Sequence, residues 1–75
     1  MSKILVIHGP NLNLLGEREK DIYGQTTLAD INALLEKEAV GLKLKVHFVQ
    51  SNHEGDIIDV IGKAKKDKID AILIN

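Results

Sequence analysis

The fold of this chain is decided by residues 4–10, which read Ile-Leu-Val-Ile-His-Gly-Pro. The first four residues are apolar and lack the polar–apolar alternation of a half-exposed strand. A short run of this kind is typical of a strand buried on both faces of a sheet. Gly9 and Pro10 then end the element. We therefore expect a strand over residues 4–7 that needs cover on both sides.

Two later segments share this character. Residues 44–49 read Leu-Lys-Val-His-Phe-Val, and residues 69–74 read Ile-Asp-Ala-Ile-Leu-Ile. Both are rich in the branched and aromatic residues that strands favour. We expect a second strand over residues 44–49 and a third over residues 69–74.

A helix is predicted between the first two strands. Thr27 and Asp30 fit a capping box in which Asp replaces the usual Glu. Leu28, Ile31 and Leu35 follow at the spacing that places side chains on one helical face, which we expect to be buried. Gly41 stands where a C-terminal cap is expected.

A second helix is predicted between the last two strands. By the same capping logic, Ser51 and Glu54 mark its beginning. Its expected apolar face consists of Ile57, Ile58, Ile61 and Ala64. The lysines around its end complement the negative end of the helix dipole and are expected on a solvated face; they are Lys63, Lys65, Lys66 and Lys68.

The order β-α-β-α-β predicts the fold class. Strands that alternate with helices indicate an α/β protein with a parallel sheet. Right-handed crossovers leave few topologies, and the simplest is strand order 2-1-3 with one helix on each face, as in a flavodoxin-like doubly wound sheet. The third strand is as apolar as the first, although two helices supply little cover for it. We therefore expect residues 1–75 to be the first portion of a larger single α/β domain.

Composition narrows the class of protein. The chain has 75 residues, a mass of 8.3 kDa, a net charge of −1 and no cysteine. This charge is too small to recruit nucleic acid or an anionic membrane, so we expect neither as a partner. No apolar run approaches the ~18–20 residues that span a bilayer, and the N-terminus lacks the pattern of a secretory signal. The expected location is the cytoplasm.

Ligands of doubly wound sheets bind beyond the carboxyl ends of the strands. Here a long loop, predicted over about residues 9–25, follows the first strand. Loops of this length in compact domains are usually functional or disordered. The residues expected at this edge are rich in amides; they are His8, Asn11, Asn13, Arg18, Tyr23, Gln50, Ser51, Asn52, His53, Glu54 and Asn75.

Several chemistries are disfavoured by the motifs. Gly9 and Gly16 are not followed by the Lys-Ser/Thr of a P-loop, and no G-x-G-x-x-G is present. His47 and His53 do not have the spacing of helical metal ligands, so no metal site is expected. We expect His8 to be a strand-end residue that hydrogen-bonds the loop.

Arg18 and Tyr23 allow two interpretations. Arg18 could be one charge in a solvated run, with the Tyr23 ring packed against the sheet edge. Alternatively, a guanidinium close to a tyrosine favours the phenolate and lowers its pKa, which would make Tyr23 a general base. Asn11 could then donate a hydrogen bond to a developing oxyanion or position a water, and Asn75 could hold a substrate hydroxyl or carboxylate.

These residues resemble a known family. Residues 9–16, Gly-Pro-Asn-Leu-Asn-Leu-Leu-Gly, together with residues 17–19 and 22–24, are similar to the signature of type II 3-dehydroquinate dehydratase. Residues 50–55, Gln-Ser-Asn-His-Glu-Gly, and the strand over residues 71–75 are also similar to that family. The resemblance covers the whole chain in order and without gaps.

The resemblance implies a reaction and roles for particular residues. The family is a hydro-lyase that converts 3-dehydroquinate to 3-dehydroshikimate by anti elimination of water, in the shikimate pathway of aromatic amino acid biosynthesis or in the quinate pathway. Tyr23 matches the base that takes a proton from C2, and Arg18 matches the residue that keeps it ionised. Asn11 matches the amide that orients a water against the enolate, and Asn75 matches a substrate-binding asparagine. Residues 11–23 match a lid that closes over substrate.

The family also implies partners and a second half. It uses no metal or organic cofactor and builds trimers that assemble into dodecamers. Its members are about twice as long, so this chain is expected to be the N-terminal half and to lack the family's general acid, a histidine. Alone it should be inactive or nearly so. The competing hypothesis is a non-catalytic doubly wound module that binds a small ligand or a partner chain at the same edge.

Overall fold

The computed structural model describes residues 2–14 and 26–75 of the chain. The elements lie in the order β1 (Lys3–His8), η1 (Leu12–Leu14, a 3-10 helix), α2 (Leu28–Gly41), β2 (Lys45–Gln50), α3 (Glu54–Lys63) and β3 (Ala71–Ile74). All three predicted strands and both predicted helices are confirmed, and the predicted strand ends and helix starts differ from the observed ones by at most two residues. Within the loop predicted over about residues 9–25, Leu12–Leu14 form η1. Residues 15–25 of that loop lie outside the described part.

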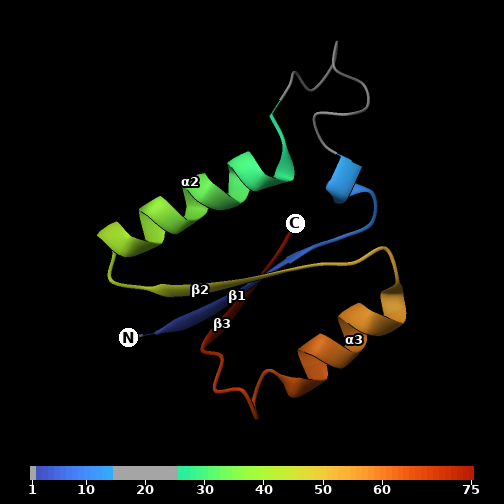
Figure 1. The fold of residues 1–75 in the computed structure, drawn as a ribbon. Coiled ribbons are helices and arrows are strands. Elements are labelled where there is room, and N and C mark those ends of the chain that lie inside the picture. Colours follow the sequence, from blue (N-terminus) through green and yellow to red (C-terminus); the bar gives the residue numbers. More distant parts are fainter. Residues whose placement is uncertain (1, 15–25) are drawn as a thin grey trace.

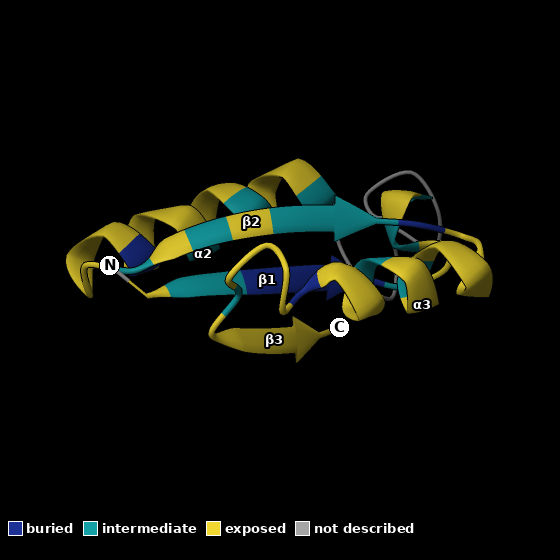
Figure 2. Cartoon of the chain, turned by 90° about the horizontal axis from the view of Figure 1, so that it is seen from below, coloured by how far each residue is buried: buried dark blue, intermediate teal, exposed yellow. Residues whose placement is uncertain are grey.

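The sheet is parallel and its strand order is β2-β1-β3, as the sequence predicts. Lys3 pairs with Lys45 and Ile4 pairs with Ala71, so β1 is bonded on both edges. The two helices lie on opposite faces of the sheet (Figures 1 and 2). The first crossover moves from β1 to β2, and the second moves in the opposite direction from β2 past β1 to β3. Because both crossovers are right-handed, their helices lie on opposite faces.

The core is centred on β1. Its residues Leu5, Val6, Ile7 and His8 are all buried, and Ile7 has no exposed surface. Burial of consecutive residues means that both faces of the strand are covered, as predicted from the unbroken apolar run. Figure 2 shows most of this burial in the middle strand, and further buried positions in α2, after β2 and after α3.

Helix α2 begins as its sequence predicts. Thr27 is the N-cap, its Oγ1 accepts a hydrogen bond from the Asp30 backbone N–H, and the Asp30 carboxylate accepts one from Thr27 N–H. This capping box satisfies two of the backbone donors that a helix leaves unpaired at its start. Leu28, Ile31 and Leu35 are half-buried, so the predicted face does lie toward the sheet.

Helix α3 departs from its prediction in two ways. Its N-cap is His53 rather than Ser51, because the Ser51 hydroxyl accepts a hydrogen bond from His53 N–H and donates to Asp56. Of its predicted apolar face, only the C-cap residue Ala64 is buried, whereas Ile58 is 59% exposed and Ile61 is 40% exposed. A groove of about 510 Å³ lies beside α3 and the sheet. Its lining includes the apolar residues Leu5, Val49, Val60 and Ile69 and the charged residues Lys3, Lys63 and Asp67.

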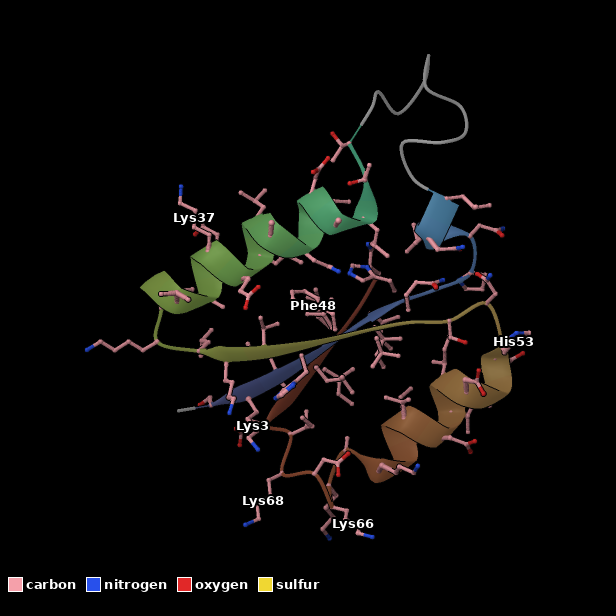
Figure 3. All side chains as sticks on the ribbon, viewed as in Figure 1. Lys3, Lys37, Phe48, His53, Lys66 and Lys68 are labelled. Carbon is pink, nitrogen blue, oxygen red and sulfur yellow. The ribbon has the colours of Figure 1, made fainter. Side chains whose placement is uncertain are left out.

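Strand β3 forms an open edge of the sheet. All four of its residues are exposed, including Leu73 at 50% and Ile74 at 67% (Figure 2). An apolar strand with one unpaired edge is prone to association. The prediction that this chain alone covers the third strand poorly is therefore confirmed. The predicted solvated lysines are exposed too, and Lys66 and Lys68 extend away from the sheet (Figure 3).

Candidate active site at the carboxyl edge of the sheet

Backbone hydrogen bonds bring the segments after the strands together. Gly9 N–H donates to the carbonyl of Asn75 at 2.9 Å, and Asn75 N–H donates to the carbonyl of Ile7 at 2.8 Å. On the other side of β1, Ser51 N–H donates to the carbonyl of His8 at 3.1 Å. The first residues beyond β1, β2 and β3 therefore share one edge, as a doubly wound sheet requires.

Asn11 lies in a tight turn held by the segment after β2. Its φ of 69° is in the left-handed region, which asparagine tolerates better than most residues. Its backbone N–H donates to Asn52 Oδ1 at 2.9 Å. Gln50 Nε2 lies 3.3 Å from the Gly9 carbonyl and 3.1 Å from Asn52 Oδ1, so it ties the same two segments together. These contacts fix the backbone from which the Asn11 side chain projects.

Asn75 is held by its side chain as well as its backbone. Its Nδ2 lies 3.1 Å from Nδ1 of His8, whose Nε2 lies 2.7 Å from Asn32 Oδ1 on α2. The His8 ring also stacks on Phe48, with ring centroids 6.2 Å apart and planes 8° from parallel. Figure 3 shows Phe48 between α2 and the sheet. The expectation that His8 bonds the loop is wrong, because both ring nitrogens pair with residues outside that loop.

One supporting residue was missed by the sequence analysis, and the role of a second was not predicted. Asn32 was not considered, although a signal for it exists: it follows Leu28 by four residues and so falls on the face turned toward the sheet. A polar side chain there needs a buried partner, and His8 is that partner. Gln50 was placed at this edge, but its role in clamping the turn at Gly9 was not predicted.

The remaining predictions concern Arg18, Tyr23, a metal site and a membrane span. Arg18 and Tyr23 lie outside the described residues, so the structure does not test their pairing. Within residues 2–14 and 26–75, no three His, Asp or Glu side chains are grouped as metal ligands would be. Among the helices of that part of the chain, none is long and apolar enough to cross a membrane.

The sheet is parallel and doubly wound, and hydrogen-bonded amides lie at its carboxyl edge. These features place the chain in the class of α/β modules whose ligand site lies at the switch point between strands. Within that class, the chain belongs to the class II dehydroquinase family, since the family model described as "Dehydroquinase class II" matches residues 2–75.

Curated relatives agree with the family. The chain is 59% identical over 75 residues to the 3-dehydroquinate dehydratase of Caldicellulosiruptor saccharolyticus, covering 100% of this chain and 52% of that protein. It is 55% identical over 74 residues to the 3-dehydroquinate dehydratase of Polynucleobacter necessarius subsp. necessarius, covering 99% of this chain and 50% of that one. The chain therefore spans about half the length of the curated relatives it matches.

Solved structures give the same fold. The type II dehydroquinase from Butyrivibrio crossotus superposes with a TM-score of 0.92 at 46% identity, covering 99% of this chain and 51% of that one. The type II dehydroquinase from Propionibacterium acnes superposes with a TM-score of 0.88 at 39% identity, covering 100% and 51% of the two chains. The flavodoxin-like expectation is thus confirmed for the portion of the domain present here.

Proposed function

We propose that this chain carries the base-bearing part of a 3-dehydroquinate dehydratase site. The Tyr23 phenolate takes a proton from C2, and the electron pair of that C–H bond forms an enolate with the C3 carbonyl. The enolate then expels the C1 hydroxyl, which leaves as water after accepting a proton from a general acid outside these residues. Arg18 keeps Tyr23 ionised and Asn11 orients a water toward the enolate oxygen.

One observation supports this assignment above the others. The hydrogen bond from Gly9 N–H to the Asn75 carbonyl, at 2.9 Å, joins the turn that carries Asn11 to the end of β3. A group meant to stabilise a developing oxyanion must be held in place before the reaction, because reorganisation would otherwise cost part of its effect. The backbone of Asn11 and the side chain of Asn75 are each held by such a contact, and this supports the proposal.

The same proposal covers the domain and its assembly. Residues 1–75 form the N-terminal portion of one α/β domain, with the remainder pairing with β3 and covering its exposed Leu73 and Ile74. The complete protein forms a trimer-based dodecamer in the cytoplasm, uses no metal or organic cofactor and binds neither nucleic acid nor membrane. The exposed apolar edge and the small core of these residues support completion by further chain.

The test compares two samples. One is the chain of residues 1–75 alone. The other, here called the joined protein, continues after Asn75 with the remaining half of the Caldicellulosiruptor saccharolyticus relative. We expect the joined protein to convert 3-dehydroquinate to a conjugated enone, whose ultraviolet absorbance measures the rate. Light scattering should give the molar mass of a dodecamer. The chain alone is expected to show no turnover.

Two results would contradict the proposed reaction. Full turnover by a sample verified at 8.3 kDa would mean that no further chain is needed. A folded joined protein that binds 3-dehydroquinate without dehydrating it would favour the non-catalytic binding module. Cell fractionation tests the location, and recovery of the protein with membranes would contradict it.

A further inference from the structure

His8 is the most buried polar residue of the described chain. It is 1% exposed, whereas Asn75 beside it is exposed at the sheet edge. Both of its ring nitrogens have partners, Asn32 Oδ1 at 2.7 Å and Asn75 Nδ2 at 3.1 Å. These two contacts avoid the desolvation cost that an unpaired nitrogen of a buried imidazole would carry.

The two partners have opposite hydrogen-bonding character. Asn32 Oδ1 can only accept, so His8 Nε2 must carry the hydrogen and donate it. Asn75 Nδ2 can only donate, so His8 Nδ1 must be unprotonated and accept. The neutral tautomer with its hydrogen on Nε2 satisfies both contacts. Donation from Nε2 to Asn32 leaves Nδ1 as the hydrogen-bond acceptor.

The ring itself has little freedom to turn. It stacks on Phe48 of β2 at 6.2 Å with planes 8° apart, and α2 holds its far nitrogen through Asn32. The backbone of Asn75 is fixed by hydrogen bonds to Ile7 and Gly9. The main remaining freedom at this site is rotation of the Asn75 side chain, including exchange of its oxygen and nitrogen.

We propose that His8 is a positioning residue whose Nδ1 sets the orientation of the Asn75 side-chain amide toward substrate, with Asn32 selecting the tautomer. This inference rests on the proposed function, in which Asn75 binds the substrate. Once one hydrogen of Nδ2 is given to His8, the other hydrogen and Oδ1 are left for a substrate hydroxyl or carboxylate. His8 thereby acts on the substrate only through Asn75.

The first test is a double-mutant cycle on the joined protein. His8→Phe keeps a ring that can stack on Phe48 but removes both nitrogens. We expect KM for 3-dehydroquinate to rise about tenfold and kcat to change less than about threefold, because the lost interaction serves the bound substrate and the transition state alike. In the Asn75→Ala background, His8→Phe should change KM by less than about twofold, because its effect passes through Asn75.

The matched control is His47→Phe, the same exchange at an exposed position in β2, which should leave KM unchanged. If His8→Phe raised KM by the same factor in the Asn75→Ala background as in the unsubstituted joined protein, the inference would be overturned. The rise in KM would then come from general packing and not from Asn75. If His8→Phe does not fold, Asn32→Ala removes only the acceptor at Nε2 and should raise KM in the same direction. Unchanged KM in that variant would overturn it too.

A second readout needs no turnover. In the joined protein labelled with 15N-histidine, long-range proton–nitrogen correlations should show His8 as the neutral Nε2–H tautomer at neutral pH. The Nδ1–H tautomer or an imidazolium would overturn the inference even if the protein is fully active. Conversely, an inactive joined protein with the Nε2–H tautomer would contradict the proposed function while leaving the His8–Asn75 contact supported.

Discussion

Tyr23→Phe is expected to lower the rate of 3-dehydroquinate dehydration by the joined protein about 10³-fold, the usual scale for removing a general base. Phe keeps the aromatic ring and loses only the phenolic oxygen. A packing role would therefore survive the exchange, whereas proton abstraction from C2 would not. Tyr23 is the only tyrosine in residues 1–75, so no neighbouring phenol of this segment can replace it. Initial rates at saturating substrate give the comparison.

The control is the fold of the variant. Far-ultraviolet circular dichroism and the molar mass should match those of the unsubstituted joined protein, which separates loss of chemistry from loss of structure. A Tyr23→Phe protein that retained more than about a tenth of the rate would contradict the assignment of the base, because general-base catalysis contributes at least ~100-fold. That outcome would direct attention to another proton acceptor.

Ile7→Ala is expected to cost the joined protein about 3 kcal/mol of unfolding free energy, within the range measured when buried Ile or Leu is truncated. Ile7 has no exposed surface and lies in the strand that is paired on both edges. The truncation leaves a cavity that the surrounding structure cannot readily fill, because helices cover both faces of β1 (Figure 1). Urea unfolding followed by circular dichroism measures the difference.

The matched control is Val40→Ala, also a truncation of a β-branched residue. Val40 is 71% exposed near the end of α2, and surface truncations usually change stability by less than about 0.5 kcal/mol. If Ile7→Ala cost no more than Val40→Ala, the placement of the core along β1 would be wrong. If both failed to fold, Ile7→Val should still show a smaller loss of about 1 kcal/mol.

Local patterns were sufficient for much of the fold. The apolar run over residues 4–7 predicted a strand covered on both faces, and three of its four residues, Leu5, Val6 and Ile7, are buried. The capping box at Thr27 located the start of α2 because its hydrogen bonds involve only neighbouring residues. Strand order followed from connection rules rather than from any one residue.

Predictions that depended on distant contacts were less successful. Around α3 the apolar residues Ile57, Ile58, Val60 and Ile61 form one broad face, so periodicity alone did not select which of them are covered. Contact with the sheet selects it. Ser51 looked like an N-cap, but its hydroxyl bonds Asp56 and His53 N–H instead.

The candidate site shows the same division. The positions of Asn11 and Asn75 at one edge follow from topology, and the family resemblance supplied their proposed roles. The contacts of His8 with Asn32 and Asn75 span 24 and 67 residues of sequence, so no local pattern could have paired them. Such contacts become visible only when α2, β1 and β3 are in place.

The most direct measurement uses 3-dehydroquinate that carries deuterium at C2 on the face opposite the C1 hydroxyl. Anti elimination by the joined protein should release this deuterium to solvent, give 3-dehydroshikimate without label, and proceed more slowly than with unlabelled substrate if C–H cleavage limits the rate. Product that retained the deuterium would show removal of the hydrogen on the same face as the hydroxyl. That result would contradict anti elimination and, with it, the proposed reaction of this chain.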